Sequence, residues 1–468
     1  MSSSLTPPEA YEPEPARRSL AALVEQLLLE SLDGASAPGC ALRVEMPVRR
    51  TDAQAWLRAQ DAGEKTYWAD RSGVFEIAGI GSADTLVETN GDGSGVFARL
   101  RERLACAHPR LRYLGGLRFN TRVPSSEAWR PFGACRFVLP RFELMVADGH
   151  SYLACNLIAP EQARVDELFE EIHAGLHSLQ FPEPGANAPM EPPLARTDSP
   201  DREGWTRTIN EALSLLHAGE LEKIVLARES RFDFPSASDA GELLRRLTLR
   251  VGRAYRFYFQ PARGVAFLGA SPERLYKRHG RHLESEAVAG TRPRGRTPEE
   301  DEALSRELLA SEKDVREHRF VVDALVAGFA SLCGAVQRGD ELSLLRLSEC
   351  QHLHRRIEGI LAETSSDAEI LRVLHPTPAV GGSPKREAMD WIARLEPFDR
   401  GWYAGPVGWV SRDAAEFAVG IRCGLVHDAS ISVYSGAGIV PGSTPQGEWD
   451  EIEGKMSNLS RVLVGDEI

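Results

Sequence analysis

The chain has 468 residues and a formal net charge of −13, with 42% hydrophobic and 26% charged residues. This composition is that of a globular protein built from one large domain or a few ordinary ones. The acidic balance argues against a general surface for nucleic acid or anionic membrane, while a local cationic pocket for a small acid is still allowed.

The cysteines and the N-terminal stretch indicate the cellular compartment in which the protein is expected. Seven cysteines lie far apart, without a CxxC pair, which predicts a reducing compartment and no disulfide frame or zinc site. The opening stretch MSSSLTPPEAYEPEP lacks the basic and apolar regions of a signal peptide, and no apolar run approaches membrane-spanning length. We therefore expect a cytoplasmic protein that binds neither nucleic acid nor membrane.

The first part of the chain is expected to be a tail followed by a structured segment. Residues 1–17 are rich in Pro and Glu and are expected to be disordered. Residues 19–32 repeat apolar side chains at helical spacing, and strand-like runs broken by turns follow up to about residue 160. Residues 18–180 are interpreted as the N-terminal part of the fold.

A proline-rich segment then divides the chain, because residues 181–203 carry almost no large apolar side chains. We expect this segment to be a linker, and residues 204–460 to form the catalytic domain. Beyond the linker come a helix, a strand at 222–229, a long helical stretch from about 298 to 333, further strands and a closing helix. Helices collected between strands in antiparallel-looking runs indicate the α+β class, with large antiparallel-rich sheet layers and helices outside.

Lys223 lies at the start of the apolar strand 222–229. Alternation along a strand places it on one face with Val225 and Ala227. Burial there would lower the pKa of the amine towards about 7–8, at a cost on the order of 4 kcal/mol, and would make it a usable base. The alternative is a lysine that extends its amine to water from the first turn of the strand.

Two predicted helices carry carboxylates on one face each. Asp314 and Glu317 are three residues apart on the first helix. Glu448 and Glu451 lie on the second, which begins with Thr444 as its N-cap. Two such pairs offer the oxygen ligands that Mg²⁺ prefers. The alternative is two solvated acidic faces, which are common in a chain this acidic.

Several motifs, taken together and in order, resemble the chorismate-utilising enzymes. They are EKIVLAR (222–228), EAVAGTRPRG (286–295), SEKDVREH (311–318), HPTPAVGGSP (375–384), GWYAGPVG (401–408) and SGAGIVPGSTPQGEWDEIEGK (435–455). The family includes isochorismate synthases, salicylate synthases and the synthase subunits for anthranilate and aminodeoxychorismate. The resemblance covers about residues 203 to 460. It implies the chorismate-binding, anthranilate-synthase-like fold, which the N-terminal residues complete.

The resemblance also implies roles for single residues. Lys223 would be the general base for water that attacks C2 of chorismate, and Glu286 would protonate the departing C4 hydroxyl. A carboxyl that donates a proton near neutral pH needs a raised pKa, and the apolar residues 287–289 beside Glu286 suit this. The cofactor would be Mg²⁺, held by Glu317 and Glu451 with Glu448 beside them. Asp314 would act through water, because relatives often carry the longer Glu there.

The remaining matched positions would contact the substrate. They are Gly290, Thr291, His352, Ala379, Tyr403, Arg422, Gly436, Gly438 and Lys455. The implied activity is Mg²⁺-dependent isomerisation of chorismate to isochorismate by a monomeric enzyme, with menaquinone or siderophore biosynthesis as candidate pathways. Ala379 favours a product that stops at isochorismate, because salicylate-forming relatives tend to carry Thr there. The alternatives are a salicylate synthase, an ammonia-using synthase component, against which Lys223 counts, and a non-catalytic homologue.

Overall fold

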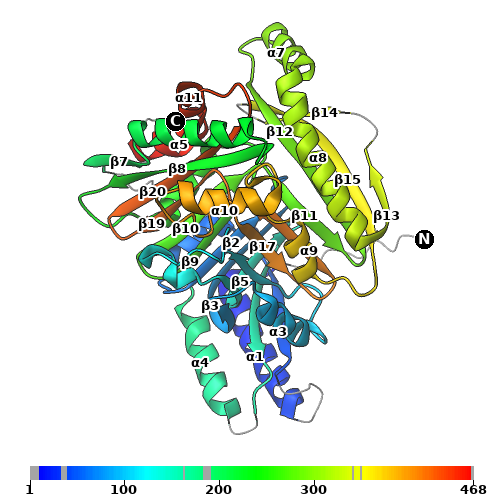
Figure 1. Cartoon of the computed structure of the whole chain (residues 1–468). Coiled ribbons are helices and arrows are strands. Elements are labelled where there is room, and N and C mark those ends of the chain that lie inside the picture. Colours follow the sequence, from blue (N-terminus) through cyan, green and yellow to red (C-terminus); the bar gives the residue numbers. More distant parts are fainter. Residues whose placement is uncertain are drawn as a thin grey trace.

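The structure is a computed structural model that describes residues 10–32, 39–161, 164–182, 191–339, 342–347 and 350–464. All of its strands belong to one extended, largely antiparallel sheet system, with helices on the outside (Figure 1). The predicted α+β fold class is therefore confirmed. No helix among the described residues combines the length and the apolar character that a membrane crossing requires.

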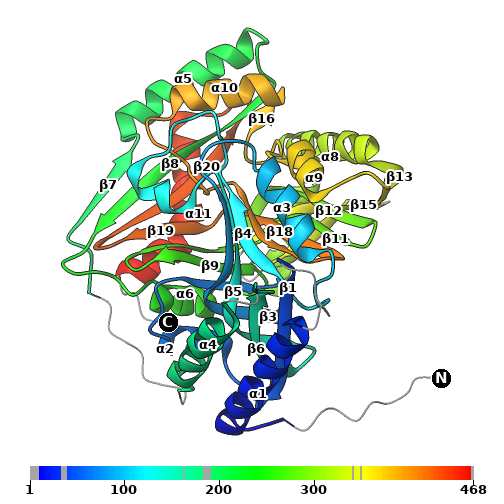
Figure 2. The same cartoon turned by 90° about the horizontal axis from the view of Figure 1, so that it is seen from below.

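The N-terminal half contributes helices around an antiparallel set of strands. Its helices are α1 (Pro13–Leu32), α2 (Ala53–Ala59), α3 (Ser94–Leu104), the 3₁₀ turn η1 (Glu127–Phe132) and α4 (Val165–Ser178). Its strands are β1 (Ala41–Val48), β2 (Lys65–Ala69), β3 (Phe75–Glu88), β4 (Tyr113–Leu117), β5 (Cys135–Ala147) and β6 (His150–Ile158). Helices α1 and α4 pack beside each other at one end of the molecule, as Figure 2 shows.

The C-terminal half is longer and carries most of the strands. Its helices are α5 (Arg202–His217), α6 (Ala240–Arg250), α7 (Pro298–Ala310), α8 (Glu312–Leu332), α9 (Asp367–Leu374), α10 (Lys385–Leu395) and α11 (Pro445–Val464). Its first strands are β7 (Ala195–Ser199), β8 (Lys223–Asp233), β9 (Tyr255–Ala262), β10 (Val265–Ser271), β11 (Arg274–His279), β12 (His282–Pro293), β13 (Cys333–Arg338) and β14 (Ser343–Arg346). The others are β15 (Cys350–Leu361), β16 (Gly382–Ser383), β17 (Pro406–Val410), β18 (Ala414–Val419), β19 (Cys423–His427) and β20 (Ser430–Ile439).

The two halves are joined through main-chain pairing. Strand β2 pairs with β9, where Tyr67 lies opposite Tyr258, and β4 pairs with β17, where Gly115 lies opposite Gly408. Fully buried tryptophans from both halves fill the core, namely Trp56, Trp68, Trp129, Trp205 and Trp402. The N-terminal residues therefore share one sheet and one core with the rest of the chain.

Two segments differ from the expected boundaries. Helix α1 starts inside the range expected to be a tail, because Ala16 is fully buried and anchors its first turns. Strand β7 forms inside the range expected to be a linker, because it pairs with β8, with Asp198 opposite Ser230. Residues 1–9 and 183–190, which also belong to these two expected segments, lie outside the described residues.

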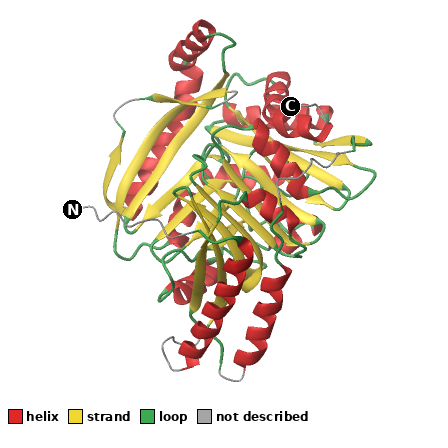
Figure 3. Cartoon of the chain, turned by 180° about the vertical axis from the view of Figure 1, so that it is seen from behind, coloured by secondary structure: helices red, strands yellow, loops and turns green. Residues whose placement is uncertain are grey.

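The predicted helical stretch 298–333 is divided into α7 and α8 at Ser311. The Ser311 hydroxyl accepts a hydrogen bond from the backbone N–H of Asp314, so this residue ends one helix and caps the next. Helix α8 lies along β12 and β15, which Figure 3 shows from behind as a long layer at one side of the molecule. The break at Ser311 therefore places Asp314 and Glu317 in the first two turns of α8.

Candidate active site

A cavity of about 650 Å³ lies between the sheet and the helices α8 and α11. Most of the predicted site residues line it. They are Gly290, Thr291, Asp314, Glu317, His352, Ala379, Tyr403, Arg422, Gly436, Gly438, Glu451 and Lys455. Lys223, Glu286 and Glu448 are not among the lining residues.

Lys223, the first residue of β8, is completely buried directly behind the cavity wall. Its Nζ donates a hydrogen bond to Glu317 Oε1 on α8 at 2.9 Å. The expected burial is confirmed, and the alternative of an amine extended to water is wrong.

Gly438 on β20 explains how Lys223 and Glu317 approach each other. A Cβ at Gly438 would lie 2.9 Å from Lys223 Cε and 3.1 Å from Glu317 Oε1. A side chain there would be closer than ordinary van der Waals contact permits. The absence of a side chain at residue 438 therefore makes room for the ion pair.

Glu317 lies among lysines. Burial alone would raise the pKa of its carboxyl, but Lys223, followed by Lys455 and Lys313, holds this pKa below its ordinary value. The side chain is therefore an anion on the cavity wall.

The other predicted metal ligands surround the same region. The Glu451 carboxylate lies 2.5 Å from Lys455 Nζ, and Asp314 pairs with Arg292 at 3.0 Å. Burial raises the pKa of Glu448, and the negative charge of Glu451 raises it further. Lys313 and Lys455 oppose this rise only in part, so Glu448 and Glu451 form a pair of neighbouring carboxyls beside Glu317. The oxygen donors of α8 and α11 are therefore chemically suited to a divalent cation.

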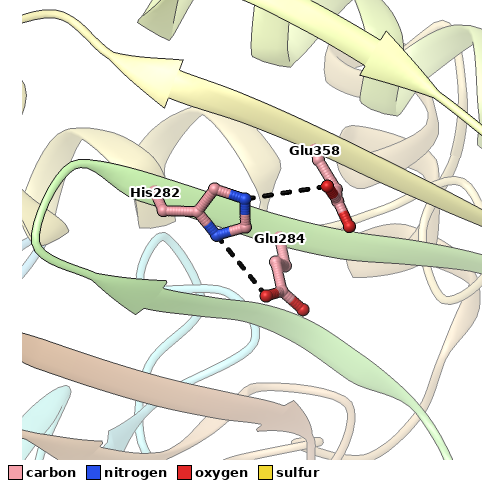
Figure 4. Close-up of side chains that lie close together, drawn as sticks. All are labelled: His282, Glu284 and Glu358. Carbon is pink, nitrogen blue, oxygen red and sulfur yellow. Dashed lines mark ion pairs between the residues drawn. The ribbon is translucent and has the colours of Figure 1, made fainter. Parts of the chain in front are cut away.

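A different group of side chains has metal-like spacing among the residues that the structure describes. His282, Glu284 and Glu358 offer ligand atoms within 4.8 Å of one another (Figure 4). The two glutamates lie directly opposite each other on β12 and β15, a like-charge pairing that Arg356 offsets, and the His282 ring lies within 3.6 Å of both carboxylates. None of these residues lines the cavity, so we interpret the group as a surface ion cluster.

Glu286 differs from its prediction. Burial raises the pKa of its carboxyl, but hydrogen bonds from His354 and Arg71, together with the charges of Arg71 and Arg274, lower it to about 2. The expectation of a raised pKa is therefore wrong. The apolar neighbours in sequence do not decide the pKa, because two arginines and a histidine reach the carboxylate from other elements.

Glu273, which is not among the predicted site residues, is a carboxyl with the raised pKa that a proton donor requires. It lies between β10 and β11, is 6% exposed and lines the cavity. Burial, followed by the negative charge of Glu286, raises its pKa to about 8, although Lys223 and Lys455 oppose this. The sequence offers only a lone Glu shortly after the apolar strand VAFLGAS, with Pro272 between them.

An irregularity near the end of β12, between Ala289 and Thr291, is held by a neutral histidine. His352 Nδ1 lies 3.0 Å from the Gly290 carbonyl and 3.1 Å from Thr291 Oγ1. Burial, reinforced by the charge of Arg422, lowers the pKa of His352 to about 4. Gly290 has φ +70°, a conformation that favours glycine. His352 is therefore uncharged at neutral pH and fixes this part of β12.

The opposite wall gathers groups suited to carboxylates. Lys455 Nζ donates to the Gly436 carbonyl at 3.0 Å, and Arg422 Nη1 donates to the Lys455 carbonyl at 2.9 Å. The Tyr403 and Tyr434 rings stack with centroids 5.3 Å apart, and a Cβ at Gly436 would lie 3.0 Å from the Tyr403 hydroxyl. Two cations and a phenol thus face one side of the cavity.

Comparisons of the sequence with known proteins find a family and relatives that span most of the chain. The family described as chorismate binding enzyme matches residues 31–464. The chain is 33% identical to the isochorismate synthase MenF of Escherichia coli (strain K12), over 95% of this chain and 99% of the relative. It is 30% identical to the isochorismate synthase MenF of Bacillus subtilis (strain 168), over 86% and 88%.

Solved structures give the same likeness. The structure of the menaquinone-specific isochorismate synthase MenF from Escherichia coli superposes with a TM-score of 0.82 at 30% identity, over 95% of this chain and all of that one. Anthranilate synthase component I from Streptococcus pneumoniae TIGR4, at 20% identity, superposes with a TM-score of 0.66 over 83% of this chain and 92% of that one, and shares the fold.

Proposed function

The chain belongs to the family of chorismate-binding enzymes, and we propose that it is an isochorismate synthase. The relatives that it matches over most of their length carry this name. The position of Glu273 supports the proposal most directly. Its carboxyl lines the cavity and has a raised pKa, and it lies close enough to Lys223 and Lys455 for their charges to affect this pKa. One amine and one protonated carboxyl at a shared site are the two proton-transfer groups that the reaction needs.

Lys223 is the proposed general base. Lys223 acts as the base in its neutral form, after the ammonium that pairs with Glu317 has given its proton to solvent. Water then attacks C2 of chorismate and gives a proton to Lys223 Nζ. The two ring double bonds shift, and the C4 hydroxyl departs. Complete burial at the start of β8 fixes the amine. A fixed base takes the proton without the entropic cost of finding its position.

Glu273 is the proposed general acid, in place of Glu286. Its carboxyl gives a proton to the departing C4 oxygen, which leaves as water. Lys223 takes one proton and Glu273 gives one, so the conversion of chorismate to isochorismate consumes and releases no net proton. A pKa of about 8 supports this role, because the acid is mostly protonated at neutral pH. Glu286, with a pKa of about 2, has no proton to give.

The proposed cofactor is Mg²⁺. Glu317 and Glu451 would hold it, with Glu448 beside them and Asp314 acting through water, since Asp314 is already paired with Arg292. When bound, the ion would hold the ring carboxylate and draw electron density from the ring.

The proposed substrate-binding groups follow from the charges of the wall. Arg422, Lys455 and Tyr403 suit the two carboxylates of chorismate, together with the backbone of Gly436 and Gly438. Gly290 and Thr291, held by neutral His352, would face the ring and its hydroxyls.

We propose isochorismate as the final product. Ala379 lines the cavity and offers no hydroxyl to orient the enolpyruvyl side chain for elimination. The rival activity is that of a salicylate synthase, which would release pyruvate. We further propose a cytoplasmic monomer that feeds menaquinone or siderophore biosynthesis.

Product identification tests the proposal. Purified protein is incubated with chorismate and Mg²⁺, the products are separated by chromatography, and pyruvate is followed with lactate dehydrogenase. We expect isochorismate without stoichiometric pyruvate. Salicylate and pyruvate would establish the rival activity, and unchanged chorismate would contradict both.

A further inference from the structure

Arg71 lies in the turn between β2 and β3, far along the chain from the cavity residues. Its guanidinium binds both carboxylate oxygens of Glu286, with Nη2 2.9 Å from Oε2, and also donates to the carbonyl oxygen of Pro272 at 2.9 Å. We propose that Arg71 and Glu286 form a clamp that positions Glu273 as the proton donor. The proposal rests on the role of Glu273 in the proposed function.

The clamp holds the chain on both sides of Glu273. Arg71 binds the carbonyl of Pro272, which precedes Glu273, and Glu286 Oε1 accepts from the backbone N–H of Arg274, which follows it, at 3.3 Å. The Glu273 carbonyl accepts from Val419 N at 3.1 Å. The backbone at Glu273 is therefore fixed from three directions, two of which depend on the clamp.

The clamp also places a fixed negative charge near Glu273. Glu286 is kept ionised by Arg71, Arg274 and His354, and its charge raises the pKa of Glu273 beyond the effect of burial. The opposing charges come from Lys223 on β8 and Lys455 on α11. The clamp thus acts on Glu273 through position and through charge, although neither Arg71 nor Glu286 lines the cavity.

Stability alone is a poor explanation for this ion pair. The Glu286 side chain is 3% exposed and that of Arg71 17%, and removing two charges from water costs about as much as their attraction returns. Because Arg71 belongs to the N-terminal half, the clamp gives that half a part in the reaction in addition to completing the sheet.

The test compares Glu286→Gln and Arg71→Gln with a matched control, Arg278→Gln. Arg278 makes a similar two-pronged ion pair with Asp367 and does not line the cavity. We expect kcat to fall between about ten- and a hundred-fold in both clamp variants, with little change in KM, because a proton donor is misplaced while substrate contacts remain. Arg278→Gln should keep the wild-type kcat.

The pH profile separates positioning from general damage. Without the charge of Glu286, Glu273 loses its proton more easily, so the alkaline limb of kcat in Glu286→Gln should move to lower pH by about one unit. An unchanged kcat and alkaline limb in both clamp variants, or an equal loss in Arg278→Gln, would overturn the proposal.

A titration keeps the inference separate from the proposed activity. In protein labelled with ¹³C at the glutamate carboxyls, the Glu273 signal is the one missing from Glu273→Gln. It should titrate about one unit lower in Glu286→Gln than in wild type. If wild-type protein forms no isochorismate, the proposed function fails, while this titration still tests the clamp. An identical titration in both proteins would overturn the effect of the clamp on Glu273.

Discussion

Lys223 and Glu317 form an ion pair at the wall of the cavity, with 2.9 Å between Nζ and Oε1, and the Lys223 side chain is fully buried. The proposed base on β8 thereby contacts a proposed metal ligand on α8. Because removing one partner of a buried pair leaves the other uncompensated, changes at the two residues are not independent.

Lys223→Ala should reduce turnover of chorismate by about 10² to 10⁴-fold, because no other described amine occupies its position to take the proton from water. Lys223→Gln preserves more of the side-chain volume, but its turnover of chorismate should fall by as much as that of Lys223→Ala. Lys277→Ala, on a half-exposed lysine of β11, is the control. Steady-state kinetics measures the loss of turnover, and thermal unfolding checks that each variant is still folded. Activity of Lys223→Ala within about tenfold of wild type would contradict the assignment of the base.

The pH dependence of kcat should report Glu273. Its pKa is raised to about 8, and the donor must be protonated, so the protonated fraction of Glu273, and kcat with it, should fall as the pH rises through about 8. Glu273→Gln keeps the shape of the side chain but has no proton to give, so kcat should fall far more than KM rises. Rates measured from about pH 6 to 9.5 check the limb, and a flat profile across pH 8 would reassign the donor.

Removal of divalent metal should abolish turnover, and added Mg²⁺ should restore it. Glu317→Ala and Glu451→Ala should each raise the Mg²⁺ concentration needed for half-maximal activity strongly, because each removes an oxygen ligand. Asp314→Ala should be milder, since Asp314 is paired with Arg292. His282→Ala serves as the control for the surface ion cluster and should not change the Mg²⁺ dependence.

Gly438→Ala should disrupt the pairing of Lys223 with Glu317. The added Cβ would lie 2.9 Å from Lys223 Cε, so one of the two side chains must move. A shift of about 1 Å in a reacting group lowers kcat roughly a hundred-fold. Gly334→Ala is the matched control, because a Cβ there meets no atom within 4 Å. Equal kinetics for the two variants would show that Gly438 has no such role.

Ala379→Thr should increase the release of pyruvate from chorismate, because a hydroxyl at this wall could orient the enolpyruvyl side chain. Wild-type protein is expected to release little. The measurement is the lactate dehydrogenase assay with isochorismate quantified in parallel. A variant that forms isochorismate and pyruvate in wild-type proportions would show that residue 379 does not decide the product.

The family could be read from the sequence because its motifs are long and local. The segments around Lys223, Glu317, Ala379 and Glu451 each carry one of the quoted motifs, and the family match over residues 31–464 confirms the resemblance. The α+β class followed from strand and helix periodicity. The place of Lys223 in an apolar strand allowed burial but left open an amine extended to water, and the resemblance to the family favoured the buried base.

The tertiary structure alone decided which carboxyl can donate a proton. The apolar residues beside Glu286 suggested a raised pKa, but Arg71 and His354 bind it from 215 and 68 residues away. Glu273 follows its strand without any local sign of a raised pKa, which arises from burial and from the charge of Glu286 on another strand. A pKa depends on the charges and solvent around a group in space, and antiparallel pairing of distant strands, which no local pattern specifies, sets both.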